Sequence, residues 1–222
     1  MKALLLVALM GLAPALLASR AAEAPAATSS SKPADSSKSA AQSAAQSAES
    51  WAQKNLAGWP AKTIALAVEL LKKYGQPAEA TPTQVTWFHN GPWKRTALFK
   101  EGVTHNFPKP HQDVLEQTID YRVPVEKVAE LLKYNGSLVI DRTRGELSAH
   151  CDSEKQNLIA LNIANDIVTG DRNVEQALAY HAQIIVGLRD GEPESYPQKL
   201  RFKPVESADA AEEAPLLVHL GD

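Results

Sequence analysis

Residues 87–123 read WFHNGPWKRTALFKEGVTHNFPKPHQDVLEQTIDYRV, and this stretch contains the clearest strand signals of the chain. Residues 83–89 and 93–99 are rich in β-branched and aromatic side chains, and an Asn-Gly pair lies between them. This pattern predicts an antiparallel hairpin. After a loop that contains two prolines, residues 114–123 alternate between apolar and polar side chains, which predicts a further strand.

The loop length of this hairpin decides which side chains share a face of the sheet. A two-residue loop would pair Phe88 with Trp93 and leave both faces mixed. A three-residue loop at 90–92 keeps proline out of the ladder and places Arg95 opposite Trp87. The sequence therefore favours the three-residue loop. One apolar face would then gather Val85, Trp87, Trp93, Ala97 and Phe99, together with His89 and Arg95.

Elsewhere the chain shows helical periodicity and a second hairpin. Capping residues and apolar stripes predict helices over residues 60–74, 124–134, 152–169 and 173–189, the last two forming an αα-hairpin. Further strands are predicted at 137–143, 146–151 and 198–203. Because β and α segments do not alternate regularly, we predict an α+β fold. Its mostly antiparallel sheet is built from hairpins and packed by an N-terminal helix, a middle helix and the C-terminal αα-hairpin.

The two ends of the chain differ in composition from its middle. Residues 1–21 have a charged start, an apolar run of about 14 residues and small residues near the end, the pattern of a signal peptide rather than a membrane span. Residues 22–50 are rich in Ala and Ser and predict a disordered tether. Residues 205–222 predict a flexible acidic tail, which leaves 51–204 as a single α+β domain. We therefore expect an exported protein, periplasmic or extracellular, that does not span the membrane after signal cleavage.

Charge and cysteine content exclude some classes of protein. The formal net charge is −3 and the pI is about 6.1, so the chain lacks the basic excess of a nucleic-acid-binding protein. Cys151 is the only cysteine and cannot form an internal disulfide. The fold must therefore be stabilised by its core.

The residue types that bind metal ions are present, but their spacing is not that of a known motif. His105, His111 and Asp113 lie in one predicted loop and match no zinc pattern, so we interpret the histidines as solvated and predict neither a metal site nor a cofactor. His150 and Cys151 are neighbours on a predicted strand and point to opposite faces, so they cannot chelate one ion together. Cys151 would be a buried apolar residue.

Signals for hydrolytic chemistry are equally weak. The sequence has no G-x-S-x-G elbow and no phosphate-binding glycine loop. Glu116 and Asp120 lie on one predicted strand about 13 Å apart, too far for a glycosidase pair. His181 falls on the inner side of the last helix and is interpreted as a hydrogen-bonded core histidine.

The residues of the first hairpin form the strongest candidate binding surface. An arginine beside indole rings can be held by cation–π contact and still bind a carboxylate, and Arg, Trp and Asn are common in binding hot spots. The structural alternative pairs Arg95 with Asp120 or Glu116 and places the tryptophans in the core. The predicted ligand-binding residues are Trp87, His89, Asn90, Trp93, Arg95, His105, His111 and Asp113.

Four segments resemble a bacterial family of uncharacterised exported proteins. They are WFHNGPWKRT at 87–96, PHQDVLEQTIDY at 110–121, RTRGELSAHCD at 142–152 and NIANDIVTG at 162–170. The resemblance covers residues 61–191 and implies one bacterial domain. It brings no catalytic role to any residue.

Two functional hypotheses follow from the sequence. The first is a non-catalytic exported domain that binds a small molecule or an envelope protein. The alternative is a hydrolase or metal-dependent enzyme in which His111 is a base or ligand and Asp113 or Glu116 orients it. Convergence of His105, His111 and Asp113 in a cleft would favour the enzyme, whereas side chains splayed in solvent would favour the binding domain.

Overall fold

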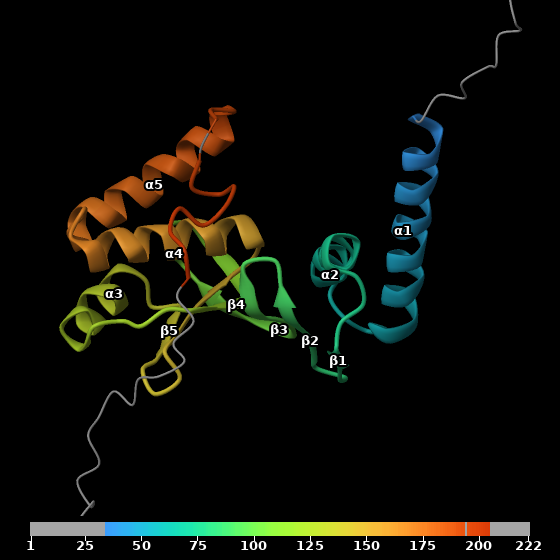
Figure 1. Cartoon of the computed structure of the whole chain (residues 1–222), viewed down its shortest axis with the longest axis horizontal. Helices are drawn as coiled ribbons and strands as arrows, with labels where there is room; N and C mark the ends of the chain where they lie inside the picture. The colour runs from blue at the N-terminus through green and yellow to red at the C-terminus, as the bar shows by residue number, and fades with distance from the viewer. Residues whose placement is uncertain (1–33, 194, 205–222) are drawn as a thin grey trace, which may run out of the picture.

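The computed structural model describes residues 34–193 and 195–204. The predicted signal peptide at 1–21, the tether at 22–33 and the acidic tail at 205–222 lie outside these residues. The described residues form one six-stranded antiparallel sheet in the order β1-β2-β3-β4-β6-β5 (Figure 1). The predicted α+β fold is confirmed.

The strands are β1 (Glu79–Ala80), β2 (Gln84–Asn90), β3 (Trp93–His105), β4 (His111–Asp120), β5 (Leu138–Asp141) and β6 (Glu146–Cys151). The helices are α1 (Ala34–Asn55), α2 (Ala61–Tyr74), the 3₁₀ turn η1 (Val125–Lys127), α3 (Val128–Tyr134), α4 (Glu154–Thr169) and α5 (Val174–Asp190). The capping box that Asn173 and Gln176 predict is present at the start of α5. The strand predicted at 198–203 is wrong, since these residues form turns and bends.

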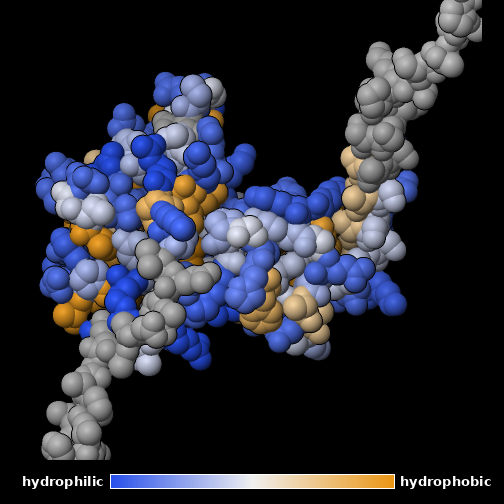
Figure 2. All heavy atoms as spheres, viewed as in Figure 1, coloured by the Kyte–Doolittle hydropathy of each residue, from blue (hydrophilic) through white to orange (hydrophobic). Residues whose placement is uncertain are grey.

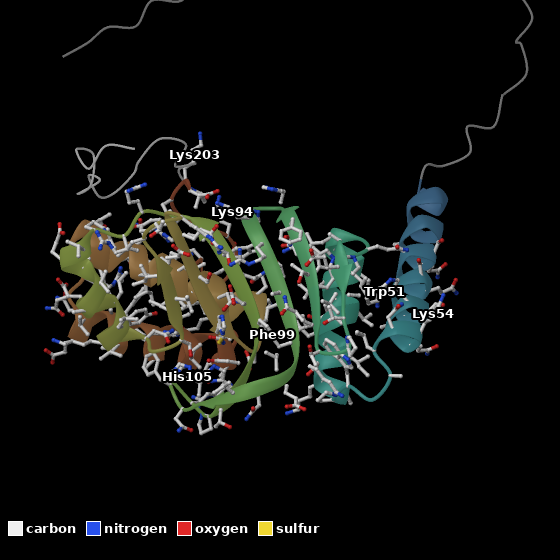
Figure 3. All side chains as sticks on the ribbon, turned by 90° about the horizontal axis from the view of Figure 1, so that it is seen from below. Trp51, Lys54, Lys94, Phe99, His105 and Lys203 are labelled. Carbon is white, nitrogen blue, oxygen red and sulfur yellow. The ribbon has the colours of Figure 1, made fainter. Side chains whose placement is uncertain are left out.

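The helices lie on one side of the sheet. Seen from below in Figure 3, the strands lie in front of α4 and α5, and no described helix covers the near face. Buried side chains of β4 and β6 pack with α3, α4 and α5 in one core cluster, which includes Ile119, Leu147 and Leu161. A second cluster joins α1 and α2 to β2 and β3 around Leu70 and Leu98. We call the uncovered side the open face.

The surface is mainly hydrophilic, as Figure 2 shows, with hydrophobic residues also visible near α3. Val125 of η1 and Leu132 of α3 are among the exposed large hydrophobic residues. Scattered exposed apolar side chains of this kind are normal for a folded domain.

Residues 34–50, predicted as part of the disordered tether, are helical and belong to α1. Alanine has the highest intrinsic helix propensity, so this composition supports a helix once it has a partner. Ala48 and Ala52 are buried beside Leu56 and Trp59, in the cluster that includes α2. The small side chains let α1 approach α2 closely, which compensates for the absence of a large apolar stripe.

The register of the first hairpin differs from the expected one. Asn90 pairs with Trp93 and Phe88 pairs with Arg95, so the loop is the two residues Gly91-Pro92. This loop also keeps proline out of the ladder, which removes the reason for preferring three residues. His89 has a φ of 50°, in the left-handed region, where the strand enters the turn.

This register separates the residues that were expected to share one face. Trp87, which pairs with Thr96, donates to the carbonyl of Gly75 at the end of α2, on the helix-covered side. Arg95 instead reaches Glu116 and Glu146, whose side chains lie on the open face. The predicted single apolar face is therefore wrong.

Candidate functional site

A cluster of His and Asp side chains lies where β3 turns back into β4. His105, the last residue of β3, pairs directly with His111, the first residue of β4, and Asp113 follows two residues later. Cross-strand partners and residues two apart lie on the same side of a strand. One ligand atom from each of these three residues lies within 4.8 Å of the other two. We call these three residues the histidine–aspartate cluster.

The cluster is largely withdrawn from solvent, contrary to the expectation of solvated loop histidines. The side chain of His111 is 7% exposed and that of Asp113 is 5% exposed, while His105 is 20% exposed. Phe107, within the connecting loop, packs edge-on against the rings of Tyr134 and His181. This aromatic contact folds the loop against the core and encloses the histidines.

Two polar atoms, an oxygen and a sulfur, lie close to the Nε2 atom of His111. Its other ring nitrogen, Nδ1, lies 2.8 Å from the carbonyl oxygen of Lys109, which can only accept, so Nδ1 carries a proton. Nε2 lies 2.9 Å from Oδ1 of Asp113 and 3.2 Å from Sγ of Cys151. Asp113 Oδ1 is nevertheless buried without a hydrogen-bond partner among the described residues, because its approach to Nε2 lacks hydrogen-bond geometry.

Ser137 fixes the other side of the Asp113 carboxylate. Its hydroxyl donates to Oδ2 of Asp113 and lies 3.1 Å from Nδ1 of His105. A serine nucleophile passes its hydroxyl proton to an imidazole, whereas Ser137 donates its single proton to the carboxylate and cannot also donate it to His105. Ser137 therefore orients the cluster and is not arranged for attack.

The environment sets the protonation of the neighbouring groups. Burial and the adjacent His111 lower the pKa of His105, and they outweigh the charge of Asp113, which alone would raise it. The lowered pKa favours the neutral form of the ring, which is the form that binds a metal ion. Burial raises the pKa of the Cys151 thiol, although hydrogen bonds from the backbone N–H groups of Asp152 and Ser153 favour its thiolate. Burial also lowers the pKa of His181 to about 4.

His181 is the hydrogen-bonded core histidine that the sequence predicts. Its Nδ1 lies 2.9 Å from the hydroxyl of Tyr134, and the residue is buried. Its Nε2 is buried without a partner among the described residues.

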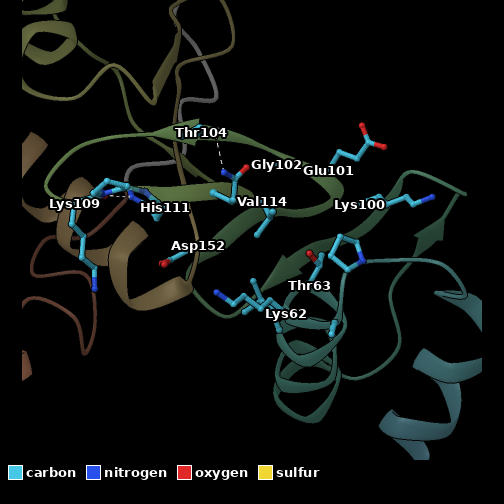
Figure 4. A pocket seen from close by; sticks show the side chains of 15 residues that line it. Lys62, Thr63, Lys100, Glu101, Gly102, Thr104, Lys109, His111, Val114 and Asp152 are labelled. Atoms are coloured by element: carbon cyan, nitrogen blue, oxygen red, sulfur yellow. Dashed lines mark hydrogen bonds between the residues drawn. The ribbon is translucent and has the colours of Figure 1, made fainter.

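Two cavities adjoin the cluster. A large open one of about 1060 Å³ lies between the first turn of α2 and the β3–β4 hairpin, with His111 and Lys109 in its wall (Figure 4). A much smaller one of about 10 Å³ lies against His111 and Cys151 and has room for about one water molecule. His111 is thus shared between the buried cluster and an accessible cavity.

The tryptophans of the predicted binding surface belong to the core, as the structural alternative expects. Both are nearly fully buried. The Nε1 of Trp87 donates to the carbonyl of Gly75 at 2.9 Å, and that of Trp93 donates to Glu154 at 2.7 Å. Asn90 is also buried and donates to Thr96, whereas His89 is exposed at the turn.

Arg95 is part of an ion-pair cluster on the open face. It pairs with Glu116 at 3.2 Å and Glu146 at 3.5 Å, and His150 lies 2.7 Å from Glu116. Lys94 extends the cluster to Asp120 at 2.7 Å. Burial would raise the pKa of Glu116, but His150 and Arg95 outweigh it and lower that pKa to about 2. Arg95 therefore already has carboxylate partners within the chain.

The sequence named three members of the site and left their convergence open. His150 and Cys151 do lie on opposite faces, as predicted, with His150 on Glu116 and Cys151 on His111. Ser137 was missed, and so was the contact between Cys151 and His111. Both depend on long-range strand packing, for which the local sequence carries no signal.

No family model, curated protein or solved structure matches this chain. The resemblance to exported bacterial proteins therefore stays an expectation. Within the described residues, no helix is both long and apolar enough to cross a bilayer.

Proposed function

We propose that this chain is an exported domain that binds a divalent transition metal ion, zinc in the first instance, through His105, His111 and Asp113. The observation that carries the proposal is the buried Oδ1 atom of Asp113, which faces Nε2 of His111 and accepts no hydrogen bond from the described part of the chain. Leaving a buried carboxylate oxygen without a partner costs free energy, and a cation between the two atoms would remove that cost.

The spacing of the atoms supports this assignment. Ligand bonds of about 2.0–2.3 Å in a tetrahedral zinc site place neighbouring ligand atoms roughly 3.3–3.7 Å apart. Nε2 of His111 lies 2.9 Å from Oδ1 of Asp113, and one ligand atom from each of the three residues lies within 4.8 Å of the other two. Adjustments of the side chains therefore bring all three ligand atoms into that range. Two imidazoles and one carboxylate form a donor set that zinc and its neighbours accept readily.

The surroundings of the cluster match those of metal ligands. Histidine ligands usually donate their second ring N–H to a carbonyl or carboxylate, and carboxylate ligands accept further hydrogen bonds. The Lys109 carbonyl accepts the second ring N–H of His111, and the Ser137 hydroxyl donates a hydrogen bond to the carboxylate of Asp113. The signal-like residues 1–21 support export, and a periplasmic or extracellular location, as part of the same proposal.

Calorimetric titration with zinc tests the proposal. We expect one ion per chain for the wild-type protein, binding weakened at least about tenfold in His111→Ala and Asp113→Asn, and no comparable effect of Mg²⁺. His89→Ala is the matched control, because His89 is exposed at a turn away from the cluster. Equal zinc affinity in the wild-type and His111→Ala proteins, with both folded, would exclude the site.

A metal-dependent hydrolase is the second candidate. The specific observation in its favour is the large cavity with His111 in its wall, because catalytic zinc sites have three protein ligands and one position open to water or substrate. In this reading His111 is a ligand and not a base. Zinc-dependent turnover of a panel of ester and phosphoester substrates, lost in His111→Ala, would support it. Zinc binding without turnover of any of them would favour a binding function.

A further inference from the structure

The thiol of Cys151 lies beside the proposed metal position, although it comes from a different hairpin. Its Sγ atom is 3.2 Å from His111 Nε2, the same nitrogen that faces Asp113 Oδ1. Cys151 ends β6 and pairs with Leu115 of the adjacent strand β4, which carries His111 and Asp113. The pairing of β4 with β6 therefore places the sulfur next to His111.

The sulfur lies close to the start of α4. Cys151 precedes the N-cap residue Ser153 by two positions, and helix N-termini favour negative charge. A small cavity is lined by Cys151 and His111, together with Lys109, Asp152 and Gln156.

We propose that Cys151, whose sulfur lies outside the 4.8 Å grouping of His105, His111 and Asp113, turns toward the ion as the fourth ligand and completes a closed, four-coordinate site with two imidazoles, one carboxylate and one thiolate. The inference rests on the proposed function, and it narrows the class of metal. Thiolate ligands favour zinc and other soft or borderline ions over Mg²⁺, Ca²⁺ and Mn²⁺. On coordination the S–H bond breaks, a metal–sulfur bond forms, and the proton passes to solvent without any change in oxidation state.

A thiolate in the fourth position also bears on the choice between the two functions. Structural and storage sites are closed by four protein ligands, whereas catalytic zinc keeps one position for water. With all four positions on the ion taken by protein ligands, the large cavity would touch the His111 side chain, but a water or substrate molecule in it would have no free position on the ion. Cys151 as a ligand therefore favours metal binding over hydrolysis.

Cobalt substitution tests this inference on the wild-type chain. Co²⁺ bound by a thiolate gives a sulfur-to-metal charge-transfer band in the near ultraviolet, and four-coordinate Co²⁺ gives intense visible bands. We expect both in the wild-type protein. We expect Cys151→Ser to lose the ultraviolet band and to weaken zinc binding at least about tenfold.

The outcomes separate this inference from the proposed function. If Co²⁺ and zinc bind at one site that requires His111 but give no charge-transfer band, Cys151 is not a ligand and the three-residue site stands. If neither ion binds, the proposed function itself is wrong. Because the band is measured on the wild-type chain, the test does not depend on the folding of Cys151→Ser.

Discussion

The half-buried carboxylate of Glu154 and the buried carboxylate of Asp113 have opposite surroundings. Glu154 accepts hydrogen bonds from the Tyr74 hydroxyl at 2.5 Å, the Trp93 indole at 2.7 Å and the Lys73 ammonium at 2.8 Å. Oδ1 of Asp113 accepts none from the described residues. The first arrangement satisfies the carboxylate within the protein, and the second is the feature on which the proposed metal site rests.

The satisfied carboxylate of Glu154 predicts a stability effect. Replacing it with Gln removes the charge that holds three donors, so we expect Glu154→Gln to lower the free energy of unfolding by about 1.5–3 kcal/mol. Glu69→Gln, at an exposed position of α2, should change it by less than about 0.5 kcal/mol. Urea denaturation measures both. Equal effects in the two variants would show that the contacts to Tyr74 and Trp93 contribute little.

At the scale of the element, the long β3–β4 hairpin positions the site through one glycine. The register of these strands shifts between Leu98 and Val103, next to Gly102. A Cβ atom at Gly102 would lie 2.7 Å from Cγ1 of Val114 and 3.0 Å from Cβ of Gln112. Only glycine lets the two strands approach this closely while His105 and His111 face each other.

We therefore expect Gly102→Ala to destabilise the domain by about 1–3 kcal/mol, because the new methyl group must displace Val114. Gly136→Ala is the matched control, since a Cβ there meets nothing within 4 Å. Thermal unfolding followed by circular dichroism compares the two. A Gly102→Ala protein as stable as Gly136→Ala would contradict the packing described for this hairpin.

The ion-pair cluster on the open face predicts a dependence of stability on pH. The pKa of Glu116 is lowered from 4.5 to about 2 in the folded state. A lowered folded-state pKa gives stability that is present above pH 4.5 and is lost as the pH falls toward 2. For the wild-type protein we expect a loss of up to about 3 kcal/mol over this window.

Glu116→Gln should flatten this part of the stability–pH curve, because the substituted side chain cannot ionise. Glu69→Gln, which lies outside the cluster, should keep the wild-type slope. Urea titrations at several pH values between 2 and 6 measure the slopes. The same slope in all three proteins would mean that other carboxylates cause the acid sensitivity.

For the whole molecule, sequence patterns predicted the fold well wherever structure is local. The hairpins, the helix after Pro60 and the capping box at Asn173 all follow from neighbouring residues. The register around Gly91-Pro92 did not follow, because two loop lengths satisfy the same proline constraint. The helix over 34–50 was missed because its alanines form no apolar stripe that the sequence shows, and they become buried only by packing against α2.

The site was harder to predict for the same physical reason. The loop between His105 and His111 contains two prolines and no motif spacing, so it resembled a solvated connection. Its burial depends on Phe107 reaching Tyr134 and His181, which come from distant helices. Residue identity could name the candidate ligands, whereas only the tertiary structure brings them together.

The most direct measurement is a crystal structure of the zinc-soaked protein, with anomalous scattering recorded at the zinc absorption edge. We predict one strong anomalous peak at roughly 2.0–2.3 Å from Nε2 of His111 and from an oxygen of Asp113. A crystal with no anomalous peak at this position, and with a water molecule donating a hydrogen bond to Oδ1 of Asp113, would contradict the account.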